Sequence, residues 1–225
     1  MTTKNVELAV IGAGPAGLSA AVSAAKAGVS VTLIDEYPRA GGQYLRGVHH
    51  PHTDPSLTAA ESLGRQRLAQ LSDLGVTVHT RTIVWGIEEK TLALYGSDSP
   101  DELNAEQIVI ATGAREHTIP FPGWTLPGVM TLGAAQILAK EHGVAPGKKV
   151  LIAGSGPLLL ATASKLTQTP GVEVVGILEA TRPQQWLSHA MAVRGNADRL
   201  QEGWHYLRTI VKHKIPYRFG HTDRK

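Results

Sequence analysis

The chain has 225 residues, of which 42% are hydrophobic and 18% charged, with a formal net charge of +3. These values are ordinary for a globular protein, and no lysine or arginine run forms the stripe that nucleic acid binding requires. The absence of cysteine excludes a disulfide, a Cys-ligated iron–sulfur cluster and a CxxC redox pair within these residues. No apolar run approaches the roughly 18 residues of a membrane span. The opening residues lack the form of a signal peptide, so we expect a cytoplasmic protein.

The stretch from Val6 to Asp35 has the pattern of a dinucleotide-binding βαβ unit. An apolar run leads into Gly12-Ala13-Gly14-Pro15-Ala16-Gly17, an Ala-rich segment follows, and a second apolar run ends at Asp35. The first glycine permits a tight turn, the second lets backbone approach a pyrophosphate, and the third brings the helix close to the sheet. Pro15 suits the first helical turn, whose free N–H groups and partial positive charge favour a diphosphate. Asp35 is placed to bind the adenosine ribose; Glu36 could replace it, although the spacing favours Asp35.

Two features follow this unit. Gly41-Gly42-Gln43-Tyr44 reads as a loop in which backbone passes close to a ligand, and we expect a flavin-side contact there rather than a simple turn. His49, His50 and His52 form the histidine cluster of the sequence, but only Asp54 lies nearby to complete a metal site. We therefore predict a loop and no metal, with a flavin or interface contact as the alternative.

The next segments predict one further helix and several strands. Residues 57–74 have helical spacing, with Leu63, Leu68, Leu71 and Leu74 on one side. Residues 76–80, 82–87 and 91–95 alternate like short strands and suggest an antiparallel addition to a parallel sheet. An apolar strand from residue 107 ends in Ala-Thr-Gly at residues 111–113, where small residues meet a ligand. A Pro/Gly-rich crossing at 119–128 is the expected boundary between domains 1–120 and 121–225.

Residues 149–160 repeat the opening pattern, with helices expected at 134–142 and 199–213 and a strand at 215–219. Gly154 and Gly156 match the first two glycines, but Leu159 occupies the third position, which serves helix packing more than phosphate contact. The following strand, 172–179, again ends in a carboxylate, Glu179. This copy could bind NAD(P), another adenine nucleotide, or nothing. The predicted fold class is α/β, with a Rossmann-like FAD-binding domain and a second, incomplete Rossmann-like NAD(P)-type domain.

The motifs GxGPAG, GGQ, ATGA and a second GSGP together resemble the two-dinucleotide-domain flavoprotein oxidoreductases. Residues 41–44, 122–129, 154–160 and 178–181 narrow the resemblance to the family that includes the B subunit of hydrogen cyanide synthase and the A subunit of octopine/nopaline oxidase. The resemblance implies FAD, held in the first domain by Gly12, Gly14, Pro15, Ala16, Gly17, Asp35 or Glu36, Gly42, Gln43, Thr112 and Gly113. Gly154, Gly156 and Glu179 mark the second nucleotide site.

The same resemblance implies a heteromeric complex in which an amine-oxidising flavoprotein subunit handles the small-molecule substrate and this chain relays electrons. Membrane association through partners stays open, and no residue is identified as catalytic. In this superfamily the chain returns after the second domain to complete the FAD domain. The present sequence stops before that return, so we expect a truncated chain or strands supplied by another chain. Two alternatives stay open, namely a stand-alone NAD(P)H:acceptor flavin reductase and a catalytically silent remnant that acts as an interaction module.

Overall fold

The computed structural model describes residues 2–45, 59–184 and 197–220. The chain divides into two compact units, Met1–Arg115 and Glu116–Lys225. We refer to them as unit 1 and unit 2 and describe each by itself. The histidine cluster at residues 49–52 lies outside the described residues. Within the described part, no group of three or more histidine, aspartate or glutamate side chains could hold a metal ion.

Unit 1 is built on a six-stranded sheet in the order β3-β2-β1-β6-β5-β4. The strands are β1 (Thr3–Ile11), β2 (Val31–Ile34), β3 (Thr77–His79), β4 (Ile83–Glu88), β5 (Thr91–Tyr95) and β6 (Glu102–Ile110). Strands β3, β2, β1 and β6 run parallel, whereas β5 and β4 are added antiparallel. The carboxyl ends of β1, β2 and β6 therefore meet at one edge of the sheet, where ligands bind in open α/β folds.

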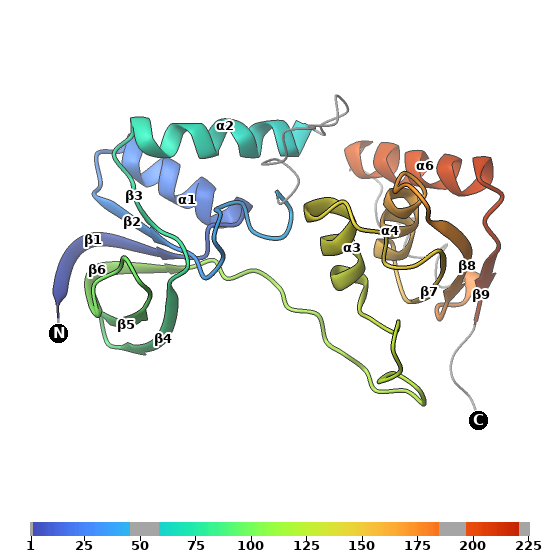
Figure 1. Ribbon diagram of the computed structural model, residues 1–225. Coiled ribbons are helices and arrows are strands. Elements are labelled where there is room, and N and C mark those ends of the chain that lie inside the picture. Colours follow the sequence, from blue (N-terminus) through green and yellow to red (C-terminus); the bar gives the residue numbers. More distant parts are fainter. Residues whose placement is uncertain (1, 46–58, 185–196, 221–225) are drawn as a thin grey trace. The chain divides into compact units, whose positions relative to one another are not determined.

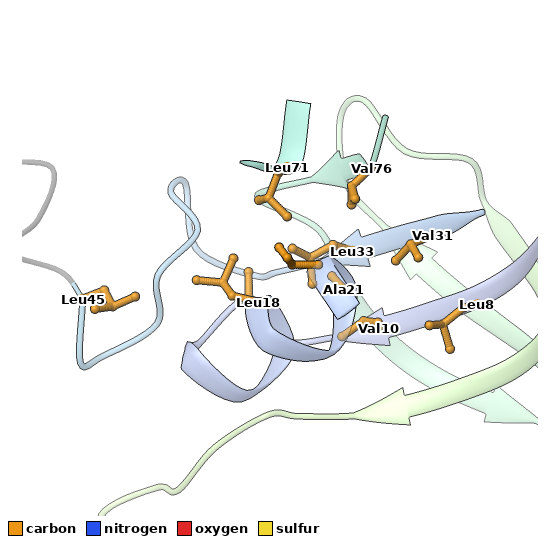
Figure 2. Close-up of a cluster of buried hydrophobic side chains, with 11 residues drawn as sticks. Leu8, Val10, Leu18, Ala21, Val31, Leu33, Leu45, Leu71 and Val76 are labelled. Atoms are coloured by element: carbon orange, nitrogen blue, oxygen red, sulfur yellow. The ribbon is translucent and has the colours of Figure 1, made fainter. Parts of the chain in front are cut away.

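Two helices, α1 (Pro15–Lys26) and α2 (Ala59–Asp73), cover one face of this sheet (Figure 1). Leu18 of α1 and Leu71 of α2 pack with Val10 and Leu33 of the sheet in a buried cluster (Figure 2). Alternate residues of β1 point to the other face, where Ala9 packs with residues of β5 and β6. Both faces of β1 are therefore buried, as its almost continuous apolar sequence requires.

The helix predicted at 57–74 is present within its described part, from Ala59 to Asp73. Leu68, Leu71 and Leu74 contribute to the core, but Leu63 is 47% exposed although it shares their side of the helix. The predicted antiparallel addition is correct for β4 and β5 and wrong for residues 76–80. These residues contain β3, which pairs parallel to β2, with Leu33 opposite Val78. Alternation of apolar residues identifies a strand but not the direction of its partner.

Unit 2 contains a three-stranded parallel sheet in the order β7-β8-β9. Its elements are α3 (Leu132–Glu141), β7 (Lys149–Gly154), α4 (Leu158–Leu166), β8 (Glu173–Glu179), α6 (Ala197–Lys212) and β9 (Tyr217–Phe219). Ile152 and Ile177 of the strands pack against Leu159 and Ala163 of α4 and Ile210 of α6. The predicted Rossmann-like α/β class is confirmed, and none of the helices in the described residues is long and apolar enough to cross a membrane.

The environment of His79 in the unit 1 sheet predicts that the stability of the protein depends on pH. His79 Nδ1 donates to the Asp98 carbonyl oxygen at 3.1 Å, while its buried Nε2 has no hydrogen-bond partner in the described part of the chain. Burial lowers the pKa of His79 below its ordinary 6.5, the carbonyl of Asp98 opposes this, and Lys4 adds to the lowering. The neutral form is therefore the one that fits the folded state.

Because the folded-state pKa is depressed, the unfolded chain binds the proton more readily below pH 6.5. We expect the stability that the neutral imidazole contributes to be complete above pH 6.5 and to be lost as the pH falls from there through the lower folded-state pKa of His79. Thermal unfolding from about pH 8 to about pH 5 measures this dependence, with His79→Asn as a control that cannot titrate. Parallel curves for the two proteins would contradict it.

Candidate nucleotide site

The turn between β1 and α1 is compact because two of its glycines carry no side chain. Gly12 has a φ of 98°, and a Cβ there would lie 2.8 Å from the carbonyl carbon of Ala111. A Cβ on Gly17 would overlap the carbonyl oxygen of Gly12. These contacts hold the first turn of α1 against the ends of β1 and β6, which explains the first and third glycines through packing within the protein itself.

Gly14, in contrast, has open space beside it. A Cβ there would meet only the Cα of Gly42, at 3.9 Å, which is an ordinary van der Waals distance. The N–H groups of Gly14, Ala16 and Gly17 have no hydrogen-bond partner among residues 2–45 and 59–115. Helix α1 has no side-chain cap and no acidic residue in its first turn. The turn thus presents unpaired donors at a helix N-terminus, the chemistry that suits a diphosphate.

Asp35 lies at the end of β2 and is only 6% exposed. Its Oδ2 accepts a hydrogen bond from the Ala13 N–H at 2.6 Å, and its Oδ1 accepts one from the Tyr37 N–H at 2.8 Å. The carboxylate therefore fixes the second residue of the glycine turn. The neighbouring Glu36 is exposed at the same edge of the sheet.

The other sequence-predicted residues of unit 1 converge on this turn. The Gly41 N–H donates to the Ala13 carbonyl oxygen at 2.7 Å, and a Cβ on Gly42 would lie 2.8 Å from the Cα of Gly14. The Gln43 side-chain amide donates to the Ala114 carbonyl oxygen at 3.5 Å. Thr112 and Gly113 lie exposed just after β6, beside Gly12. Segments far apart in the sequence thus form one continuous edge around the unpaired N–H groups.

The equivalent turn in unit 2 is arranged differently. Glu179 at the end of β8 is fully buried, and its two carboxylate oxygens accept the Gly156 N–H at 3.3 and 3.2 Å. It also accepts the Thr181 N–H at 3.0 Å and the Tyr217 hydroxyl at 3.1 Å. Leu159, in the third glycine position, points into the core of unit 2 with no exposed surface.

The charge on Glu179 is stabilised by these donors. Burial opposes ionisation, but the hydrogen bonds from Thr181, Gly156 and Tyr217 outweigh it and hold the pKa of Glu179 below its ordinary value. Burial, the charge of Glu179 and the hydrogen bond to it raise the pKa of Tyr217 well above its ordinary 10. The pair therefore consists of an ionised carboxylate and a neutral phenol. Sequence reasoning missed Tyr217 because it lies 38 residues beyond Glu179 and carries no motif.

The geometry of unit 1 agrees with comparisons to known proteins. The sequence profile named pyridine nucleotide-disulphide oxidoreductase matches residues 6–202, which is most of the chain. The chain belongs to the pyridine nucleotide-disulphide oxidoreductase family. The name includes a disulphide, but the chain has no cysteine, so a redox disulfide is not part of these 225 residues.

Two relatives found by sequence comparison are named as enzyme subunits. The chain is 33% identical to the HcnB subunit of hydrogen cyanide synthase from Pseudomonas aeruginosa, over 96% of this chain and 47% of that protein. It is 41% identical to the A subunit of opine oxidase from Agrobacterium tumefaciens, over 78% of this chain and 37% of that protein. The resemblance described from the motifs is confirmed, and the chain spans less than half the length of these relatives.

A structural match supports the fold. The crystal structure of L-proline dehydrogenase from P. horikoshii has a TM-score of 0.65 and 23% identity, covering 80% of this chain and 37% of that one. At this identity the match shows the fold alone. The match therefore supports the α/β fold described above.

Proposed function

We propose that this chain is an FAD-binding oxidoreductase subunit that relays electrons in a complex oxidising amines or amino acids. The proposal is based on the N–H groups of Gly14, Ala16 and Gly17, which have no partner among the described residues of unit 1, and on the open space at Gly14. Backbone donors at a helix N-terminus suit the diphosphate that joins the two halves of FAD. The relatives named as subunits of hydrogen cyanide synthase and opine oxidase support the class of complex.

Different residues of unit 1 would contact different parts of FAD. Gly14, Ala16 and Gly17 would hold the diphosphate, and Gly42 and Gln43, next to Thr112 and Gly113, would line the path towards the flavin. When bound, FAD supplies the redox chemistry, and the protein binds and orients it. None of the described residues is assigned as a general base, in keeping with a substrate handled by a partner protein.

The partner in this proposal is an amine-oxidising flavoprotein subunit. These 225 residues contain no cysteine pair through which a disulfide could carry electrons. In this proposal electrons travel between flavin and acceptor directly, or between flavins of adjacent subunits. A cytoplasmic location for the complex is part of the same proposal.

The test is the absorbance spectrum of the purified protein, followed by titration with FAD. We expect yellow protein, or colourless protein that takes up one FAD per chain with quenching of flavin fluorescence. A colourless product that binds no added FAD would reject the proposal. Mixing the loaded protein with an amine-oxidising flavoprotein partner then tests the relay, because reduction of the bound flavin by an amino acid should require the partner.

A second prediction separates the two acidic residues at the end of β2. Asp35 is buried and already accepts two backbone N–H groups, so we propose that it holds the turn while the exposed Glu36 reaches the ribose hydroxyls. We expect Glu36→Gln to lower FAD affinity about tenfold, in line with loss of a charged hydrogen bond, without changing the unfolding temperature.

Asp35→Asn is the matched variant. We expect it to lower both the unfolding temperature and the FAD affinity, because an amide cannot replace the carboxylate at two backbone donors without presenting its own NH2 group to one of them. Thermal unfolding of the FAD-free proteins and FAD titration give the two readouts. An unchanged affinity in Glu36→Gln, with a loss confined to Asp35→Asn, would assign the ribose to Asp35 instead.

A further inference from the structure

The two βαβ turns of this chain differ in what their N–H groups bind. In unit 1 the shorter carboxylate, Asp35, reaches Ala13, the second residue of its turn. In unit 2 the longer carboxylate, Glu179, reaches Gly156, which corresponds to Gly14. One additional methylene group thus moves the acceptor along the turn by one residue. It moves from the Ala13 position to the Gly14 position, whose N–H has no partner among the described residues of unit 1.

Two further N–H groups of the second turn are also paired internally. The Leu159 N–H, which corresponds to the unpaired Gly17 N–H, donates to the Gly156 carbonyl oxygen at 3.2 Å. The Leu160 N–H donates to the Pro157 carbonyl oxygen at 3.1 Å. Helix α4 begins at Leu158, one position later than α1 does relative to its own glycines. The N–H groups of Leu159 and Leu160 are therefore paired within this turn instead of pointing outwards.

The strands on either side close the second turn further. Pairing between β7 and β8 continues to Gly154 opposite Glu179, whereas pairing between β1 and β2 stops at Ile11 opposite Ile34. The Ala180 N–H donates to the Gly154 carbonyl oxygen at 2.8 Å. The hydroxyls of Ser155 and Thr181 lie 2.8 Å apart and are hydrogen-bonded. The turn is thus tied to the chain that leaves β8.

We propose that Glu179 acts as an internal substitute for the phosphate at the second turn, so that unit 2 takes no dinucleotide. The carboxylate supplies the negative charge that the turn would otherwise obtain from a ligand, and its own charge repels a diphosphate. Tyr217 and Thr181 hold it there from β9 and from the chain after β8. The inference concerns unit 2 alone and does not require FAD in unit 1. It excludes the stand-alone reductase in which NAD(P)H binds at the second turn.

The test uses ADP, the portion shared by FAD and NAD, in the full chain with Gly14→Ala to weaken binding in unit 1, at ADP concentrations low enough to leave that weakened site empty. We expect equilibrium dialysis to detect no ADP bound to this protein. Adding Glu179→Gln removes the repelling charge and should tighten ADP binding by at least about tenfold. Tyr217→Phe in the same background is the matched control, since it removes one hydrogen bond but keeps the charge, and it should gain no binding.

A ligand-binding role for Glu179 predicts the opposite change in ADP affinity on Glu179→Gln. If Glu179 binds a ribose, the Gly14→Ala protein binds ADP and Glu179→Gln weakens that binding. Either that result, or no change on Glu179→Gln in a folded protein, overturns the proposal.

Amide hydrogen exchange of the unsubstituted protein is the second measurement. We expect the Gly156 and Leu159 amides to be protected and those of Gly14 and Ala16 to exchange rapidly without FAD, and rapid exchange at Gly156 would also overturn it. A failure to bind FAD, by contrast, affects only the function proposed for unit 1.

Discussion

Gly14→Ala is expected to weaken FAD binding by about 10–100-fold while leaving the unfolding temperature of the FAD-free protein almost unchanged. Gly14 has φ −73° and ψ −177°, an extended conformation that alanine adopts without strain. Its added Cβ would touch only the Cα of Gly42, at 3.9 Å. The protein itself therefore has room for the methyl group. The methyl group would instead obstruct a ligand that approaches the turn and lower its affinity.

The two readouts make this substitution informative. FAD titration followed by flavin fluorescence measures the affinity, and thermal unfolding without FAD measures the effect on the fold. Gly86→Ala is the matched control, because its Cβ would lie 3.7 Å from the Cβ of Ala93 on β5, away from the turn. It should change neither quantity appreciably. If Gly14→Ala binds FAD as tightly as the unsubstituted chain, the turn does not contact the diphosphate and the proposed site is wrong.

Local patterns in the sequence were sufficient to locate the elements that carry the site. The glycine turn, the helix after it and the terminal carboxylate are neighbours in sequence, so their spacing alone defines a βαβ unit. The GGQ and ATG segments could be placed at the same edge because parallel strands end together there. The direction of β3 could not be predicted in this way, since a strand of three residues alternates identically whether its partner is parallel or antiparallel.

The hydrogen bonding of the second turn also could not be predicted from the sequence. Gly154, Gly156 and Glu179 match the pattern of the first copy, and the pattern does not say whether the carboxylate faces a ligand or the turn. The answer depends on how far the Glu179 side chain reaches and on Tyr217, which a different strand brings to it. Leu159 in place of the third glycine, and Glu179 in place of an aspartate, were the local signs of the difference. Its side chain fills the unit 2 core, while the glycine of the first copy is required by close packing of backbone.

The two copies therefore share one fold and differ in the hydrogen bonding of their turns. In unit 1 the buried carboxylate stabilises the shape of the turn, and the N–H groups of Gly14 and Ala16 have no partner among the described residues of that unit. In unit 2 the Glu179 carboxylate accepts the N–H of Gly156, which corresponds to Gly14. A βαβ unit stabilises a parallel sheet whether or not it binds a ligand, because its apolar strands and helix bury a core in either case. Retention of the fold is thus weaker evidence for nucleotide binding than the state of the N–H groups in its turn.

Gly17→Ala should produce the largest loss of stability among the substitutions in unit 1. In an exposed helix this change is favourable by about 1 kcal/mol, because alanine restricts the unfolded chain and has the higher helix propensity. Here the added Cβ would overlap the Gly12 carbonyl oxygen, and the backbone of Gly12 is held by its N–H, which donates to the Ile34 carbonyl oxygen at 2.7 Å.

We therefore expect Gly17→Ala to lower the free energy of unfolding by about 2–3 kcal/mol, with a fall in unfolding temperature on the order of 10 °C. Chemical denaturation and thermal unfolding of the FAD-free protein measure the two quantities. Ser19→Ala is the control, since it places a methyl group two residues further along α1 and removes only a hydrogen bond to the Pro15 carbonyl oxygen. A Gly17→Ala protein as stable as the unsubstituted chain would show that α1 does not approach the turn this closely. It would remove the packing explanation for the third glycine, whereas the Gly14→Ala result tests the ligand explanation for the second.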